Sequence, residues 1–504
     1  MSEPLLLGVD AGLTNVKAVA FDRSGTAVAG SSTDTPGRSP APGRDEQDHD
    51  DLWAAAVDVI DSVLAEGAVD SEAVAGVGLS GHGHGLYALD EAGDPVCGVK
   101  STDDRGAAVL DAWAADGRLD EAADLLGWRP FGADPYCLLG WFDRERPAVA
   151  ERIDTVLFCK DVLANRLTGA RSTDAMDGSA LVPPDGDTEA VLDALDLDEY
   201  AGAVPDVIDS TDACGTVTAD ATAETGLPEG VPVAAGLHDV GACALGAGVT
   251  GPGEATVILG TWGQSVVVTD GPDAGSGGLP RRYLDGWLRY RGTRAGAACL
   301  DWFVDEFGDE WRAEADERGV DPYEVYEERA ASVPAGAEGV LFHPYLNGST
   351  DHPEARGGFY GLDLDASRDR MLRAVYDGVA TALALGVEDF DVAVDDLRVS
   401  GGGAQSHLWT RTFADLLDDT VRVPDGTEMG ARGAAVCGGV AAGVYADVDG
   451  AVAETVGIQR RHDPDSERAE RYRTVAAAFE EARDAMGPAW GTLMRLSGQR
   501  GGRE

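Results

Sequence analysis

The sequence predicts an α/β protein built from two similar domains. Its 504 residues exceed what one hydrophobic core usually serves. A strand–turn–strand pattern opens the chain at residues 5–22, and the same pattern returns at residues 254–269. We therefore expect two domains of one type, residues 1–248 and 249–504, whose hairpin turns face a shared cleft.

The individual elements follow from periodicity and turn residues. Apolar runs bounded by Gly, Asn or Asp predict strands, and apolar residues three and four positions apart predict helices. Strands are expected at 5–10, 16–22, 26–30, 74–80, 231–236, 254–259, 264–269 and 396–399. Helices are expected over 50–64, after 239, from 407, from 428 and over 464–486. The Gly- and Pro-containing stretch 249–253 predicts the joint between the domains.

The run Gly236–Gly248 places a carboxylate between a strand and a helix. An apolar run ends at Gly236, Asp239 follows, and small apolar residues continue as a tightly packed helix. Proteins of the α/β class bind ligands at such corners. A helix N-cap is the alternative for Asp239, because Asp is a favoured capping residue. Together with the turns described next, the pattern predicts that Asp239 is the catalytic residue.

The hairpin turn at residues 10–17 has residue types that hold phosphate groups. Gly12 permits close backbone approach, and the Thr14 hydroxyl can donate to a phosphate oxygen. Lys17 offers a positive charge in a chain that has only two other lysines, and Asp10 can hold a hydrated Mg²⁺. The alternative is an ordinary hairpin turn with a surface lysine.

Three segments of the second half complete a nucleotide site. The turn Gly260-Thr261 is equivalent to the first turn and would contact phosphates from the opposite side of the cleft. After the strand at 396–399 come residues that leave room for a purine and a ribose, namely Gly402, Gly403 and Ala404. Residues 428–435 form a small-residue helix that suits close packing, with an adenine wall as the alternative. The alternative for the turn at 260–261 is a plain glycine turn, and the alternative for the 402–404 segment is a flexible loop.

Composition excludes several classes of partner. The formal net charge is −51, and the acidic residues are spread along the whole chain. Such a surface repels nucleic acid and anionic membranes and is typical of proteins from extreme halophiles. The seven cysteines include no C-x-x-C pair, which argues against a disulfide framework or a zinc site. The apolar run at 5–9 is too short for a signal or a span of about 20 residues, so a cytoplasmic location is expected.

Taken in order, the motifs of this chain resemble those of the FGGY family of carbohydrate kinases, within the actin-like ATPase superfamily. The matching elements are Asp10–Lys17, Leu79–Gly85, Asp103–Arg105, Lys160–Gly169, Gly236–Gly248, Gly260–Gly263, Gly357–Asp377 and Ser400–Ser406. The resemblance implies two ribonuclease-H-like domains flanking a catalytic cleft. It also implies a sugar bound mainly to the first domain, ATP bound mainly to the second, and Mg²⁺.

The resemblance also assigns roles to single residues. Asp239 would be the general base, with Mg²⁺ associated through water with Asp10 and Asp239. The side chains that would hydrogen-bond the sugar beside Asp239 are His82, His84, Asp103 and Arg105. A histidine-rich surface turn is the alternative for the two histidines. A surface ion pair or a helix cap is the alternative for Asp103 and Arg105.

The substrate turn is where this chain departs most from the family pattern. Ser80–Gly85 looks like the Ser-Gly-Gln-Met-His-Gly of xylulose kinases, with His82 in place of Gln. The wider run 81–90 looks more like L-xylulose kinases. Smaller departures are Leu13 and Arg370. We expect a ketopentose kinase; glycerol, erythritol or ribulose kinases and a nucleotide-binding sensor without kinase activity are the alternatives, and a homodimer is compatible with each.

Overall fold

The computed structural model describes residues 3–294, 296–349 and 354–498. Its first half is organised by a mixed sheet with the strand order β10-β11-β4-β1-β2-β3, and β12 also pairs with β4. These strands are β1 (Leu5–Ala11), β2 (Asn15–Phe21), β3 (Ala27–Asp34), β4 (Val74–Gly81), β10 (Ala213–Thr216), β11 (Pro232–Ala234) and β12 (Leu237–His238). The strands β1 and β2 pair antiparallel, whereas β1 and β4 pair parallel.

The second sheet repeats this plan, with the order β15-β16-β14-β13-β19-β20-β21. Its strands are β13 (Glu254–Leu259), β14 (Gly263–Thr269), β15 (Leu279–Tyr283), β16 (Gly286–Thr293), β19 (Asp396–Ser400), β20 (Val421–Pro424) and β21 (Ile458–His462). The opening pair β13–β14 is antiparallel, and β13 pairs parallel with β19. The predicted fold of two similar α/β domains is confirmed.

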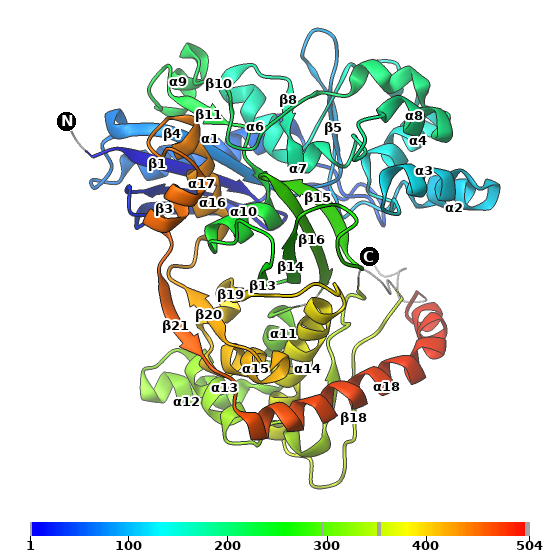
Figure 1. Cartoon of the computed structure of the whole chain (residues 1–504), viewed down its shortest axis with the longest axis vertical. Helices are drawn as coiled ribbons and strands as arrows, with labels where there is room; N and C mark the ends of the chain where they lie inside the picture. Colours follow the sequence, from blue (N-terminus) through cyan, green and yellow to red (C-terminus); the bar gives the residue numbers. More distant parts are fainter. Residues whose placement is uncertain (1–2, 295, 350–353, 499–504) are drawn as a thin grey trace.

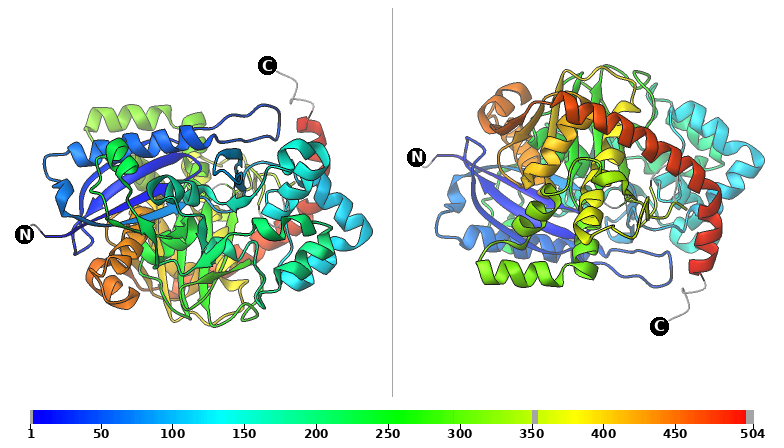
Figure 2. Two further views of the ribbon diagram at one scale, coloured as in Figure 1. Left: turned by 90° about the horizontal axis from the view of Figure 1, so that it is seen from above. Right: turned by 90° about the horizontal axis from the view of Figure 1, so that it is seen from below.

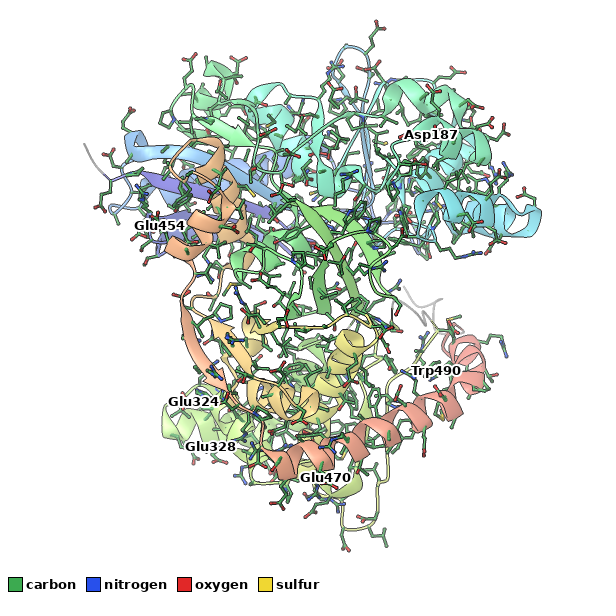
Figure 3. The ribbon with its side chains drawn as sticks, in the orientation of Figure 1. Asp187, Glu324, Glu328, Glu454, Glu470 and Trp490 are labelled. Carbon is green, nitrogen blue, oxygen red and sulfur yellow. The ribbon has the colours of Figure 1, made fainter. Side chains whose placement is uncertain are left out.

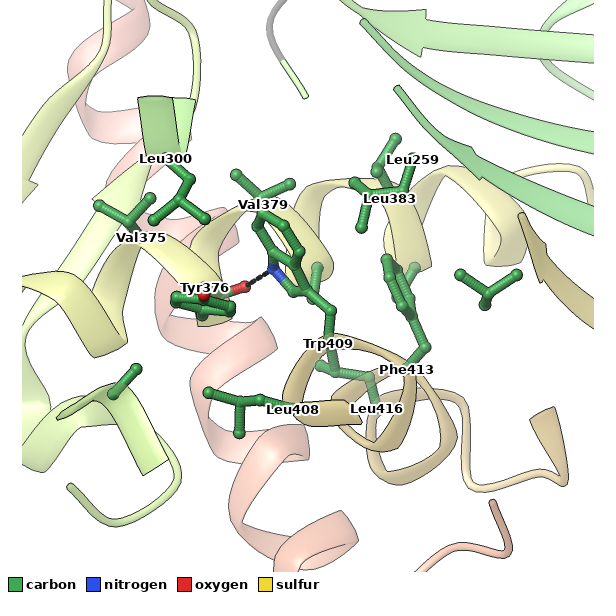
Figure 4. Close-up of a cluster of buried hydrophobic side chains, with 14 of the residues drawn as sticks. Leu259, Leu300, Val375, Tyr376, Val379, Leu383, Leu408, Trp409, Phe413 and Leu416 are labelled. Carbon is green, nitrogen blue, oxygen red and sulfur yellow. Dashed lines mark hydrogen bonds between the residues drawn. The ribbon is translucent and has the colours of Figure 1, made fainter. Parts of the chain in front are cut away.

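Helices cover the outer face of each sheet. On the first sheet they are α1 (His49–Ala65), α6 (Cys159–Thr168) and α9 (Ala219–Thr225). On the second they are α11 (Ala298–Phe307), α12 (Asp309–Arg318), α13 (Pro322–Ala331), α14 (Arg368–Glu388) and α15 (His407–Leu417). Figure 4 shows part of this second core, where Trp409 Nε1 donates to the carbonyl oxygen of Tyr376 over 3.0 Å. The long helix α18 (Ser466–Gly498) lies across the outside of this half (Figure 2).

A separate helical cluster extends the first half. Its helices are α2 (Ala107–Asp116), α3 (Arg118–Leu126), α4 (Pro135–Glu145) and α8 (Thr188–Leu195). They pack beside a small sheet of β5 (Leu86–Leu89), β6 (Pro95–Val99) and β7 (Thr155–Leu157). The segment between α3 and α4 reaches back toward the end of β4, where the site lies.

Two glycine-rich helices lie between the sheets. α10 (Asp239–Gly246) and α16 (Met429–Ala441) share a core with residues of both sheets, including Leu6 and Val266. Their backbones touch, because a Cβ on Gly433 would lie 1.9 Å from the carbonyl oxygen of Ala242. The predicted close packing of the small-residue helix is confirmed.

The helix α16 also shows that part of the second half of the chain packs within the first half. It belongs to the second half of the sequence, yet it packs on β1 and β4 of the first sheet. α17 (Val448–Thr455) follows it there, and Glu454 pairs with Arg23. The division at residue 249 therefore separates the strands of the two sheets but not these two helices (Figure 1).

Exposed acidic residues are found on the outside of both halves. Figure 3 labels exposed carboxylates at Asp187 and Glu454 in the upper half, and at Glu324, Glu328 and Glu470 in the lower half. This distribution fits a solvated surface rather than one acidic patch. Among the described residues, every helix is too short or too polar to cross a membrane.

Candidate functional site

Strand register brings three predicted elements of the site together. In the parallel pair β1–β4, Asp10 lies opposite Ser80, and His238 of β12 lies opposite Gly81 of β4. Asp239 follows at once as the first residue of α10. The carboxyl ends of β1, β4 and β12 thus meet at one edge of the sheet, where α/β proteins bind their ligands.

Asp239 is held by its neighbour in the chain. Its Oδ1 lies 3.0 Å from His238 Nε2 and accepts a hydrogen bond from the Val240 amide over 2.7 Å. Burial acts to raise the pKa of Asp239, but the imidazole outweighs it, so the pKa lies below its ordinary value. The carboxylate is therefore ionised near neutral pH, with its side chain 33% exposed. His238, not Asp239, occupies the N-cap position.

Asp10 forms a second carboxylate centre beside Asp239. Ser80 Oγ donates to Asp10 Oδ1 over 2.9 Å. Burial, together with the charge of Asp239, raises the pKa of Asp10 to about 6. A Cβ on Gly430 of α16 would lie 2.4 Å from Asp10 Oδ2, so glycine is needed at this contact.

The predicted phosphate lysine has a protein partner. Lys17 Nζ lies 3.1 Å from Glu428 Oε2 at the start of α16, and both side chains are about one third exposed. The sequence suggested a mobile charge, but the structure places Lys17 in an ion pair. This ion pair joins the first hairpin to α16. To bind a phosphate, Lys17 would have to break its ion pair with Glu428 or contact both anions at once.

In each hairpin turn the glycine amide donates a hydrogen bond to a backbone carbonyl oxygen of the same turn. The Gly12 amide donates to the carbonyl oxygen of Asn15 over 3.0 Å, and the Gly260 amide donates to Trp262 over 3.1 Å. These two amides are therefore engaged within the turns. The exposed Thr14 and Thr261 remain on the outer side of each turn.

The third glycine turn lies against the second hairpin. A Cβ on Gly403 would meet Leu259 Cγ at 2.5 Å, so β13 and this turn are in close contact. Gly402 has open space at its Cβ position, and Ala404 is buried. The structure thus brings Gly260, Thr261 and the 402–404 turn to one edge of the second sheet.

The two predicted sugar-binding histidines are buried and neutral. His82 Nε2 lies 3.1 Å from Tyr87 Oη, and burial lowers the pKa of His82 to about 4. His84 Nδ1 lies 2.8 Å from Asp134 Oδ1, and its Nε2 lies 2.8 Å from Tyr290 Oη. Burial also lowers the pKa of His84. Both ring nitrogens of His84 are thus occupied, and this residue joins the two halves of the chain instead of standing free for a sugar.

Asp103 and Arg105 are committed to each other. Arg105 Nε and Nη2 each lie 2.8 Å from an Asp103 oxygen, and Nη2 also contacts Glu46 over 2.9 Å. Arg105 borders a cavity of about 280 Å³ whose lining includes neither the two histidines nor Asp239. The ion-pair alternative therefore describes these two residues, although the pair is buried and not on the surface.

A buried cluster of charged side chains lies behind the site and was not predicted from the sequence. Lys160 Nζ lies 2.6 Å from Asp161, 2.9 Å from Asp174 and 3.2 Å from Asp177. Its backbone is next to Gly81, where a Cβ would lie 3.0 Å from the Lys160 nitrogen. The rarity of lysine in this chain was the available signal, but two of the three partners, Asp174 and Asp177, come from a separate segment.

Replacing Asp177 by asparagine is expected to stabilise the fold at pH 8 and less so at pH 5. Burial raises the pKa of Asp177 from 3.8 to about 7, against the attraction of Lys160. The folded chain therefore holds a proton that the unfolded chain releases, and stability falls as pH rises from about 4 to 7. Asparagine cannot ionise, so we expect a melting temperature higher by about 2–6 °C at pH 8. A melting difference that is the same at both pH values would contradict this account.

Comparisons with known proteins agree with this geometry. Residues 5–246 match the N-terminal domain of the FGGY family of carbohydrate kinases, and residues 255–442 match its C-terminal domain. An L-xylulose/3-keto-L-gulonate kinase of Escherichia coli is 30% identical over 452 residues, covering 87% of this chain and 88% of the relative. A gluconokinase of Bacillus subtilis is 27% identical and covers 94% of both chains.

A solved structure extends the match to three dimensions. The xylulose kinase from Rhodospirillum rubrum superposes with a TM-score of 0.81 at 26% identity, covering 97% of this chain and all of that one. The predicted family and its two-domain fold are confirmed. This chain belongs to the FGGY family of carbohydrate kinases, which transfer a phosphoryl group from ATP to a sugar hydroxyl.

Proposed function

We propose that this kinase phosphorylates a ketopentose of the xylulose type, with Asp239 as the general base. The observation that carries the proposal is the ionised Asp239 carboxylate at the start of α10, beside a second carboxylate at Asp10. The relatives named for L-xylulose and xylulose support the substrate class.

The chemistry requires a proton acceptor and a fixed geometry. A sugar hydroxyl is a poor nucleophile, and its proton passes to Asp239 as the oxygen attacks the γ-phosphorus. The new O–P bond forms while the bond to the leaving ADP oxygen breaks. His238 keeps the Asp239 carboxylate charged and fixes its orientation, because its Nε2 lies 3.0 Å from Oδ1.

The carboxylates fit Mg²⁺ held together with a nucleotide. Within the described residues no group of three or more His, Cys, Asp or Glu side chains could hold a metal alone. Mg²⁺ commonly uses one or two carboxylates, waters and substrate phosphates, which suits Asp10 and Asp239. When bound, it would neutralise charge that develops on the transferred phosphoryl group. Gly12, Thr14, Lys17, Gly260, Thr261 and the 402–404 turn would hold the nucleotide.

The substrate panel tests the proposal directly. ADP release with Mg-ATP should be measured with D- and L-xylulose, D- and L-ribulose, glycerol and erythritol. We expect one ketopentose to give the highest kcat/KM. A preference for glycerol or erythritol would overturn the ketopentose assignment. ATP hydrolysis unaffected by any sugar would favour a nucleotide sensor.

Activity is expected to need molar KCl. At a net charge of −51, carboxylates on both halves repel one another and also repel ATP. Salt screens both effects, since the Debye length falls to about 3 Å at 1 M. We expect kcat/KM and the melting temperature to rise together between 0.1 and 2 M KCl. Full activity in dilute buffer would contradict a halophilic surface.

A further inference from the structure

Arg281 of β15 is a buried cation without an anionic partner. It is 1% exposed, its Nη1 donates to the carbonyl oxygen of Pro280 over 2.9 Å, and its Nη2 is buried without a hydrogen bond. Throughout the described residues it forms no ion pair. Other buried arginines are satisfied: Arg373 pairs with Asp377 at 2.9 Å, and Arg289 donates to three carbonyl oxygens.

Such a group is costly unless something outside the chain completes it. A guanidinium that loses water without gaining an anion is strongly unfavourable. The Trp128 ring lies 4.1 Å from Arg281 Cζ and covers one face of the guanidinium. Stacking leaves the N–H groups in the guanidinium plane able to bind a planar anion, and a carboxylate matches that geometry.

Strand register places Arg281 next to the site. In the antiparallel pair β15–β16, Arg281 lies opposite Leu288, and Leu279 lies opposite Tyr290. Arg281 and Tyr290 are therefore diagonal neighbours on the same face of the sheet. The Tyr290 hydroxyl contacts His84, and its ring lies 5.5 Å from that of His238, the partner of Asp239.

The segment between α3 and α4 closes the other side. Trp128 stacks on Arg281, Phe131 packs its ring 4.8 Å from His84, and Asp134 holds His84 Nδ1. Burial lowers the pKa of His84 and raises that of Tyr290, and the nearby charge of Arg281 acts to lower both. Arg281 thus belongs to the cluster that surrounds the proposed base, one side chain beyond Tyr290.

We propose that Arg281 binds the carboxylate of a sugar acid, so that this kinase phosphorylates an aldonate or ketoaldonate as well as a neutral ketopentose. The proposal rests on the proposed function, because it uses the same base and the same phosphoryl transfer. The carboxylate stays intact at one end of the substrate. At the other end a hydroxyl gives its proton to Asp239, forms the O–P bond and releases ADP.

The test compares Arg281→Gln with Arg282→Gln, in 2 M KCl with Mg-ATP. Arg282 is the neighbouring residue on the same strand, is exposed, and points to the opposite face, so it loses the same charge outside the site. The substrates are aldonates and ketoaldonates of five and six carbons beside neutral ketopentoses. We expect Arg281→Gln to lower kcat/KM for the acids by about 10- to 100-fold and for neutral ketoses by less than about 3-fold. Arg282→Gln should leave both unchanged.

A second measurement does not depend on turnover. Without ATP, the best acid should raise the melting temperature of the wild type and of Arg282→Gln, but not that of Arg281→Gln. Arg281→Lys, which keeps the charge, should restore part of the acid activity and serves if the Gln variant fails to fold. Equal losses on acids and neutral sugars would make Arg281 structural and overturn the proposal.

The outcomes also separate this proposal from the proposed function. Turnover of ketopentoses by a wild type that neither binds nor phosphorylates any acid overturns the role of Arg281 alone. Arg281-dependent binding of an acid, with no ketopentose turnover, supports Arg281 and overturns the ketopentose assignment.

Discussion

Replacing Asp239 by asparagine is expected to lower kcat by about 10²- to 10⁴-fold while leaving ATP affinity nearly unchanged. Asparagine keeps the size of the side chain and its bond to the Val240 amide, but it cannot accept the substrate proton. The loss should appear in kcat and not in KM, because the proton moves only in the transition state. Single-turnover ADP formation and calorimetric titration with nucleotide measure the two quantities.

A matched control separates chemistry from helix stability. Asp220 also lies in the first turn of a helix, α9, but α9 packs on α1 and α6, whereas α10, which begins at Asp239, packs on α16. Asp220→Asn changes the helix-terminal charge in the same way and should retain full activity. Near-normal turnover by Asp239→Asn would refute the assignment of the base, whatever its melting temperature.

Local sequence signals predicted the scaffold and the position of the proposed base. The hairpins at 5–22 and 254–269 and the Asp239 junction depend on turn glycines and apolar runs, which act within a few residues. The structure has β1–β2, β13–β14 and α10 at these positions. The contact between His238 and Asp239 could also have been predicted, because the two residues are adjacent in the sequence.

Partners that are distant along the chain could not be predicted. The ion pair of Lys17 with Glu428 spans 411 positions, and the contact of His84 with Tyr290 spans 206. Neither has a local pattern, because each depends on how the two halves dock. For the same reason the sequence did not single out Arg281. Arg281 and Arg282 are adjacent, and only the strand register shows which of the two faces the site.

The helices α10 and α16 pack backbone to backbone at Gly433, and Gly433→Ala is expected to disrupt this contact. The added Cβ would lie 1.9 Å from the carbonyl oxygen of Ala242 and 3.0 Å from the Gly246 amide. Backbone atoms cannot rotate away as a side chain does, so α10 and α16 must separate. Overpacking of this kind costs about 1–3 kcal/mol, which corresponds to a melting temperature lower by about 2–6 °C in a chain of this size.

The control is Gly491→Ala in α18, where the new Cβ would meet the flexible end of the Arg495 side chain at 3.6 Å. Within a helix, that change removes backbone freedom and is expected to stabilise by up to about 1 kcal/mol. The two variants make the same chemical change, so opposite signs isolate the helix contact. Equal melting temperatures for both would show that α10 and α16 can move apart freely.

The activity of Gly433→Ala then tests how the site is assembled. α10 begins at Asp239, and α16 begins next to Glu428, the partner of Lys17. Moving the helices apart therefore moves the proposed base relative to Asp10, which touches α16 at Gly430. A misplacement of about 1 Å can cost about 10²-fold in rate, so kcat should fall even at temperatures where the variant is folded. A folded variant with normal kcat would mean that the carboxylates are positioned by the first sheet alone.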